Sequence, residues 1–163
     1  MNSWGKEFII EVLKENDFFG YTSVLNECVR KKTAVTIEES KIGLIPVKDF
    51  KYLLYSNNEI SFYITKYISA KLSFASEKAM QLAYDSARKR VANALIYITN
   101  IYLGNSQLSA GLNISRENIS AISGLSLETV SRTLTEFKQD GYIEVNNRNI
   151  KIIEQQKLEF LRN

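Results

Sequence analysis

The pattern of apolar residues changes twice along this chain, from strand-like to helical and then to a mixture of both, which divides the chain into three parts. Before residue 50, apolar residues gather in three short strand-like runs, Phe8–Leu13, Thr33–Ile37 and Lys41–Ile45. From residue 58 to about 103 they recur at spacings of three and four, which is the period of a helix. Shorter helical and strand patterns follow. We therefore expect three segments, residues 1–57, 58–103 and 104–163.

The middle segment predicts one long helix with a break near Asp85–Ser86, where either residue can cap a new helix. Asn58 is the candidate N-cap, and a shorter helix near Lys48–Tyr55 precedes it, after Pro46. The apolar stripe is Ile60, Ile64, Ile68, Leu72, Ala75, Ala79 and Leu82. Such a stripe packs either on a sheet of its own chain or on a twin helix across a two-fold axis. At about 1.5 Å per residue the helix is longer than a small sheet, which favours packing against a twin helix in a dimer.

Residues 114–138 predict two short helices joined by a glycine turn. Ser115 and Ser126 are good N-caps, and Gly124 stands where the chain must turn with a positive φ. The second helix carries its apolar residues on one face, at Val130, Leu134 and Phe137. This spacing is typical of a helix-turn-helix. The alternative is an ordinary helical hairpin in an all-α core.

A β-hairpin is predicted directly after this pair of helices. Gly141 is the candidate C′ glycine of the second helix, the position where a residue in the left-handed conformation commonly ends a helix. Tyr142–Val145 and Asn149–Ile153 alternate as strands around a turn at Asn146–Arg148. A helix-turn-helix followed by a hairpin is a winged helix, whose second helix is shaped for the major groove of DNA.

Composition narrows the chemistry that the chain can perform. Among its 163 residues there is no histidine and one cysteine, Cys28. Ser-His-Asp catalysis, histidine-ligated zinc, histidine-ligated haem and an iron–sulfur cluster are therefore excluded, and no glycine-rich phosphate loop is present. We expect no catalytic residues, no metal site and no enzymatic activity. The absence of a signal-peptide pattern and of an apolar run of about 20 residues favours the cytoplasm and no membrane association.

Charge adds little to the argument for nucleic acid. The net charge is +3, and residues 115–151 carry five basic and five acidic side chains. The DNA-binding interpretation therefore depends on the motif and on where the charges fall. The basic triplet Arg88–Arg90 predicts a solvated helix face, or alternatively a contact with the DNA backbone.

Strands, one long helix and then a winged helix is an order that resembles the Crp/Fnr family of bacterial transcription regulators. The resemblance covers nearly the whole chain and is strongest over residues 114–119 and 124–132. It implies an α+β fold with a cyclic-nucleotide-binding-like β-roll (jelly roll), a long dimerisation helix and a C-terminal winged helix-turn-helix. The family's roll has about twice as many strands as this chain supplies, so we expect residues 1–57 to form a partial, truncated roll.

The resemblance also locates an effector pocket, at Gly20, Tyr21, Lys32 and Thr33. Cyclic-nucleotide binders of the family carry a glutamate where this chain has Tyr21, and an arginine where it has Lys32. Lysine attracts phosphate but lacks the planar fork of arginine, and tyrosine does not replace a carboxylate. We therefore expect no cofactor, neither a cyclic nucleotide nor haem nor an iron–sulfur cluster.

Three residues on the exposed side of the second helix are the candidates for reading bases: Glu128, Ser131 and Arg132. Arg132 can donate two hydrogen bonds to the O6 and N7 of guanine, Glu128 can accept from the N4 of cytosine, and Ser131 suits either edge. The resemblance implies the same roles. The alternative role for Glu128 and Arg132 is an ion pair between residues i and i+4 of one helix.

The candidates for contact with the DNA backbone lie at the helix starts and the wing tip: Ser115, Arg116, Ser126, Thr129, Asn147 and Arg148. The expected function is a homodimeric transcription regulator that reads a palindromic operator in double-stranded DNA, with RNA polymerase as a further candidate partner. The competing hypothesis is a winged helix that serves protein contacts and reads no bases.

Overall fold

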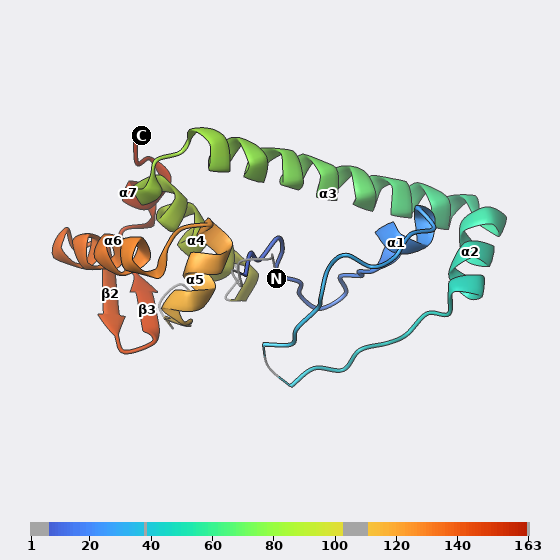
Figure 1. Ribbon diagram of the computed structural model, residues 1–163, viewed down its shortest axis with the longest axis horizontal. Coiled ribbons are helices and arrows are strands. Elements are labelled where there is room, and N and C mark those ends of the chain that lie inside the picture. Colours follow the sequence, from blue (N-terminus) through green and yellow to red (C-terminus); the bar gives the residue numbers. More distant parts are fainter. Residues whose placement is uncertain (1–6, 38, 103–110, 163) are drawn as a thin grey trace. The chain divides into compact units, whose positions relative to one another are not determined.

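Helices dominate the computed structural model, which describes residues 7–37, 39–102 and 111–162 (Figure 1). Seven helices and three short strands are assigned in this part of the chain. In chain order they are α1 Tyr21–Leu25, α2 Val47–Ser56, α3 Asn58–Tyr84, α4 Ala87–Tyr102, β1 Leu112–Asn113, α5 Arg116–Ser123, α6 Leu127–Gln139, β2 Ile143–Asn146, β3 Asn149–Ile152 and α7 Gln155–Glu159. Contacts divide the chain into two units, one of Met1–Glu15 with Ala75–Asn163 and one of Asn16–Phe74.

The first unit contains the main hydrophobic core, which is that of a winged helix. Helices α4, α5, α6 and α7 bury Leu95, Ile119, Phe137 and Leu158 completely. The buried positions of α6 are Val130, Thr133, Leu134 and Phe137, spaced at three and four. The predicted apolar stripe of this helix is therefore confirmed as its packing face.

A three-stranded antiparallel sheet of order β1-β3-β2 completes this unit. Ile143 lies opposite Ile152, and Val145 opposite Ile150, so that one face of the hairpin packs on the core. Asn147 turns the chain with a φ of 56°, one of the few non-glycine residues with positive φ. Asparagine tolerates this conformation because its short polar side chain can bond locally. The predicted hairpin is confirmed, with a turn of two residues.

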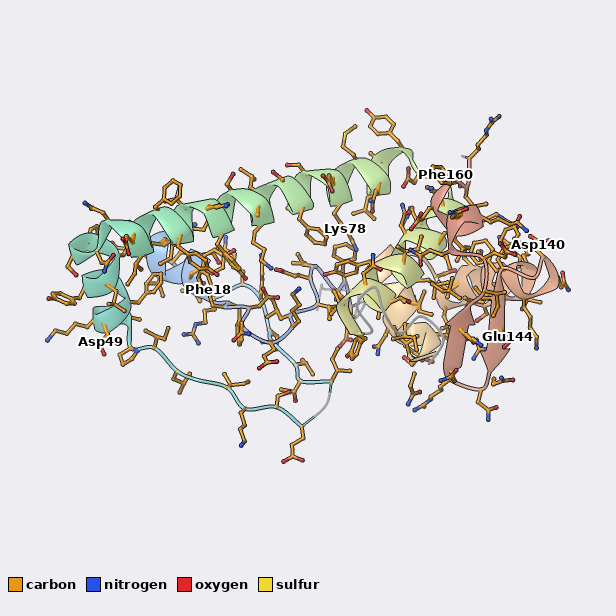
Figure 2. All side chains as sticks on the ribbon, turned by 180° about the vertical axis from the view of Figure 1, so that it is seen from behind. Phe18, Asp49, Lys78, Asp140, Glu144 and Phe160 are labelled. Carbon is orange, nitrogen blue, oxygen red and sulfur yellow. The ribbon has the colours of Figure 1, made fainter. Side chains whose placement is uncertain are left out.

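The second unit is held by an aromatic cluster on α3. The rings of Phe18 and Tyr67 stack with centroids 4.2 Å apart, and Tyr21 meets Tyr67 edge-on at 5.9 Å. Tyr67 also donates to the backbone oxygen of Phe18 at 3.0 Å, and burial raises the pKa of its hydroxyl. Figure 2 labels Phe18, which lies against α3. The cluster fixes the start of α1 to the helix.

The predicted break in the long helix is confirmed, since α3 ends at Tyr84 and α4 begins at Ala87. The hydroxyl of Ser86 accepts from the backbone N–H of Lys89 at 3.3 Å and so caps α4, as expected. The N-cap of α3 is one residue earlier than predicted. Asn57, not Asn58, accepts from the N–H of Ile60 at 3.0 Å.

The prediction of three strands before residue 50 is wrong. Phe8–Leu13, Thr33–Ile37 and Lys41–Ile45 are assigned neither strand nor helix in the described part of the chain, so no partial β-roll is built. A strand is stable only when another strand pairs with its N–H and C=O groups. Because the described residues supply no partner strands here, the alternation alone does not form a sheet.

The first of these three runs instead packs on the winged helix. The N–H of Ile9 donates to the carbonyl of Ala121 in α5 at 3.0 Å, and the N–H of Val12 donates to the hydroxyl of Tyr97 in α4 at 2.9 Å. Val12 is 9% exposed and belongs to the winged-helix core. The first run thus contributes to a core that lies far away in the sequence.

Candidate nucleic-acid interface

The two helices of the predicted helix-turn-helix start at serine caps. The hydroxyl of Ser115 accepts from the N–H of Asn118 at 3.1 Å, and that of Ser126 accepts from the N–H of Thr129 at 3.2 Å. Gly124 joins the helices at a φ of 65°. All three predictions are confirmed.

The turn is fixed by hydrogen bonds to its carbonyls. Ser120 donates from its hydroxyl to the carbonyl of Leu125 at 2.6 Å. Arg90, from α4, donates from Nε and Nη2 to the carbonyl of Ser123 at 3.0 and 2.7 Å, and from Nη2 to that of Gly124 at 2.7 Å. A Cβ at Gly124 would lie 3.2 Å from this guanidinium. The turn therefore favours glycine for its φ, and a larger residue would also require this guanidinium to shift.

The basic triplet of α4 forms contacts within the protein, so the predicted solvated face is wrong, while the alternative, a contact with the DNA backbone, stays a prediction. Arg88 bonds to Glu136 at 2.9 Å and to Asp140, both on or next to α6. Lys89 donates to the backbone carbonyl of Glu159, and Arg90 braces the turn. Nothing in the local sequence distinguishes such residues from solvated ones, because their acceptors lie 33 to 70 positions away.

The three candidate base-reading residues lie away from the core. Glu128 is exposed, Ser131 is half-buried, and 72% of the Arg132 side chain is exposed, while Val130 and Leu134 on the other face are buried. The structure therefore brings these polar groups together on one outward face of α6. Leu127, beside them at the start of the helix, is 44% exposed.

The ion pair expected within α6 has a different partner. Nε of Arg132 lies 4.0 Å from Oε1 of Glu136, four residues later in the sequence, rather than near Glu128. In the described part of the chain, Glu128 forms no ion pair or hydrogen bond with its side chain. The carboxylate of Glu128 can therefore accept a hydrogen bond from another molecule. Arg132 has its acidic neighbour, Glu136, one turn later in the helix.

The candidate backbone contacts lie at three places, the starts of α5 and α6 and the wing tip. Arg116 is exposed in the first turn of α5, and Asn147 and Arg148 are exposed at the wing tip. The hydroxyls of Ser126 and Thr129 lie 2.8 Å apart at the start of α6. The carboxylate of Glu117 adds a negative charge near Arg116 and Arg148. Hydrogen bonds from its own N–H and from Ser115 lower the pKa of this carboxyl, and Arg148 and Arg116 lower it further.

The candidate effector residues do not form a nucleotide pocket in this structure. Gly20 caps α1 with a φ of 86°, and the ring of Tyr21 packs on Phe18 at 4.9 Å. Lys32 and Thr33 are exposed in a segment without strand or helix. These groups supply neither walls nor the carboxylate and guanidinium that a cyclic nucleotide would require. Among the described residues there is also no group of three side chains that could hold a metal ion.

Two protein-family models match this chain, one in each half. Residues 1–57 match the cyclic nucleotide-binding domain, and residues 89–161 match the Crp-like helix-turn-helix domain. The chain belongs to the Crp/Fnr family. The second match begins within α4, so the Crp-like domain includes the helix that braces the turn.

Known Crp/Fnr proteins are similar over most of the chain. The cAMP-activated global transcriptional regulator CRP of Salmonella typhimurium is 28% identical over 155 residues, which cover 91% of this chain and 71% of that protein. FixK2 from Bradyrhizobium japonicum is similar in structure, with a TM-score of 0.62 at 24% identity over 71% of this chain and 58% of that one. The c-di-GMP responsive regulator CLP of Xanthomonas campestris gives a TM-score of 0.56 at 19% identity, over 66% and 55%.

These likenesses set the fold class as α+β with a cyclic nucleotide-binding domain and a helix-turn-helix. The chain spans little more than half the length of the two solved structures. CRP is named for activation by cAMP and CLP for its response to c-di-GMP. Because a cyclic nucleotide-binding match is present, the expectation that this chain takes no effector stays a prediction. No helix in the described ranges has the length and hydropathy that a membrane span needs.

Proposed function

We propose that this chain is a sequence-specific DNA-binding transcription regulator of the Crp/Fnr type, which reads a palindromic operator as a homodimer. The observation that supports the proposal is the division of α6 into two faces. Its buried face, with Val130, Leu134 and Phe137, holds the helix rigidly on the core. Its outward face presents Glu128, Ser131 and Arg132. Relatives named as transcription regulators, such as CRP, support the same role.

Base reading follows from the chemistry of these side chains. The guanidinium of Arg132 suits the O6 and N7 of a guanine, and Glu128 suits the N4 amino group of a cytosine. Ser131 serves either kind of edge. The caps Ser115 and Ser126, with Arg116, Thr129, Asn147 and Arg148, would contact phosphates and set the register. RNA polymerase is a further partner for such a regulator, and the cytoplasm is the expected location.

Mutation of Arg132 tests the base-reading proposal. Operators are first selected from random DNA, and the affinity of each variant is then measured by mobility shift. Arg132→Ala should cost roughly 1–3 kcal/mol on the selected operator and relax the preference at one base pair. Lys138→Ala removes an equal charge from the end of α6 and should leave that preference intact. Equal discrimination by wild type and Arg132→Ala would contradict base reading.

The competing function, a winged helix for protein contacts, is favoured by the charge balance of residues 115–151, where five acidic side chains match five basic ones. Salt separates the two functions. Phosphate contacts release counterions from DNA, so the logarithm of the binding constant should fall steeply and linearly with the logarithm of the salt concentration. A flat salt dependence, or no measurable binding to any selected DNA, would favour the protein-contact function.

The dimer is proposed from the exposed apolar residues of α3. This helix has 27 residues and is therefore about 40 Å long. Phe62, Leu72 and Met80 are 73%, 67% and 60% exposed, which a twin helix would cover. Sedimentation at micromolar concentration should show a dimer for the wild type and a monomer for Phe62→Asp. Tyr55→Asp, which changes an aromatic residue of α2 that is 81% exposed, should remain dimeric.

A further inference from the structure

A salt-bridge network connects the start of α4 to the C-terminal end of α6. Nη1 of Arg88 lies 2.9 Å from Oε2 of Glu136, and its Nη2 bonds to Oδ2 of Asp140. Asp140 is labelled at the C-terminal end of α6 in Figure 2. The guanidinium also lies over the ring of the buried Phe137, 4.9 Å from its centroid. Two carboxylates and a ring therefore hold this arginine, and it in turn fixes one oxygen of Glu136.

The other oxygen of Glu136 faces the candidate base-reading arginine. Its Oε1 lies 4.0 Å from Nε of Arg132, so one carboxylate lies between two guanidinium groups. Within the described residues the terminal nitrogens of Arg132 have no hydrogen bond or ion pair. The contact thus engages the inner nitrogen and leaves the outer fork, the part that can bind guanine with two hydrogen bonds.

We infer that Glu136, held by Arg88, is a positioning residue that orients Arg132 for its base and so sets the selectivity of the protein. The inference depends on the function proposed above. An exposed arginine loses much rotamer freedom when it binds a base edge, and this loss weakens binding. A carboxylate that is itself fixed restricts the arginine before DNA arrives, so less freedom is lost on the correct base. Without a fixed partner, the same ion pair would move with the side chain and orient little.

The test compares Glu136→Gln with Asp140→Asn. Each substitution neutralises one of the two carboxylates that bind Arg88, and each removes one negative charge from the same end of α6. Only Glu136 faces Arg132. The measured quantity is a ratio of dissociation constants, for the selected operator and for a variant operator changed at the one base pair where Arg132→Ala loses discrimination. A uniform effect of charge on affinity cancels in this ratio.

Glu136→Gln should reduce the discrimination ratio by roughly threefold to tenfold, the range expected when one long side chain must be immobilised on binding. Asp140→Asn should leave the ratio within about twofold of wild type, because Arg88 keeps its contacts with Glu136 and with the ring of Phe137. Thermal melting should show that both variants lose stability. In an Arg132→Ala background, Glu136→Gln should change the ratio no further, because the side chain that it orients is absent.

Equal ratios for Glu136→Gln and Asp140→Asn would overturn the inference while leaving the proposed function standing, provided that Arg132→Ala still loses discrimination. An additional loss from Glu136→Gln in the Arg132→Ala background would also overturn it, since Glu136 would then act on the base directly. Unchanged discrimination in Arg132→Ala would overturn both the inference and the proposed function.

Discussion

The winged helix and the segment of residues 29–45 contain similar apolar residues, and the structure treats them in opposite ways. Val91, Val130 and Leu95 are fully buried in the winged helix, whereas Val29, Val35 and Leu44 are 84%, 81% and 92% exposed. Of the buried hydrophobic residues in the described chain, Ile64 is the one that lies within residues 16–74. The two regions therefore differ in packing far more than in composition.

The difference follows from how helices and strands form the hydrogen bonds of their backbone N–H and C=O groups. A helix such as α6 closes its hydrogen bonds within itself, so it needs a neighbour only for its apolar face. A strand needs a neighbour for its backbone as well as for its side chains. In the winged helix each of the short strands finds that neighbour, since β3 pairs on both sides. The alternating segment finds none within the described chain.

The largest expected effect tests this contrast directly. Phe137→Ala removes a fully buried ring from the winged-helix core and should lower the free energy of unfolding by about 3–5 kcal/mol. Leu44→Ala, at a residue that is 92% exposed, should change it by less than about 0.5 kcal/mol. Urea denaturation followed by circular dichroism measures both. A similar loss for the two variants would show that residues 29–45 are packed in solution.

A smaller effect is expected from the arginine that braces the turn. Arg90→Ala removes three hydrogen bonds to the carbonyls of Ser123 and Gly124 and should cost about 2 kcal/mol of unfolding free energy. Arg30→Ala removes the same type of side chain from an exposed position and should be nearly neutral. The comparison uses the same urea titration, and an unaffected Arg90→Ala would mean that α4 does not hold the turn.

The packing of the first apolar run gives a further comparison. Val12→Ala should lower the free energy of unfolding by about 1 kcal/mol, because two methyl groups leave a nearly buried site. Val35→Ala makes the same chemical change at a residue that is 81% exposed and should have no measurable effect. If neither variant loses stability, residues 7–13 do not belong to the winged-helix core.

The smallest effect concerns pH. The pKa of Glu117 is lowered in the folded protein by hydrogen bonds from its own N–H and from Ser115. Its ionised form therefore stabilises the fold above the ordinary pKa of 4.5, and this contribution is lost as pH falls through the lowered folded value. Melting temperatures of wild type and Glu117→Gln should differ slightly near pH 7 and converge as the pH falls through the lowered pKa of the folded state. A difference that grows on acidification would contradict this.

Local signals in the sequence predicted much of the candidate interface. Ser115, Gly124 and Ser126 were identified by their residue types, because capping and positive φ are properties of a few neighbouring residues. Asn57 was missed as a cap by one position, since two consecutive asparagines suit the same role equally well. The partner of Arg132 was also misassigned, because Glu128 and Glu136 are both four residues away from it in a helix.

The sequence by itself therefore determined the elements whose hydrogen bonds close within a few residues: the break between α3 and α4, the serine caps, the glycine turn and the hairpin. Only the tertiary structure decided which long-range partners the remaining groups find. Arg88 and Arg90 became braces, and Val12 became part of a distant core. Thr33–Ile37 and Lys41–Ile45 remained unpaired. The physical reason is that such contacts depend on which distant surfaces are present to receive a side chain or a strand, and no local pattern records this.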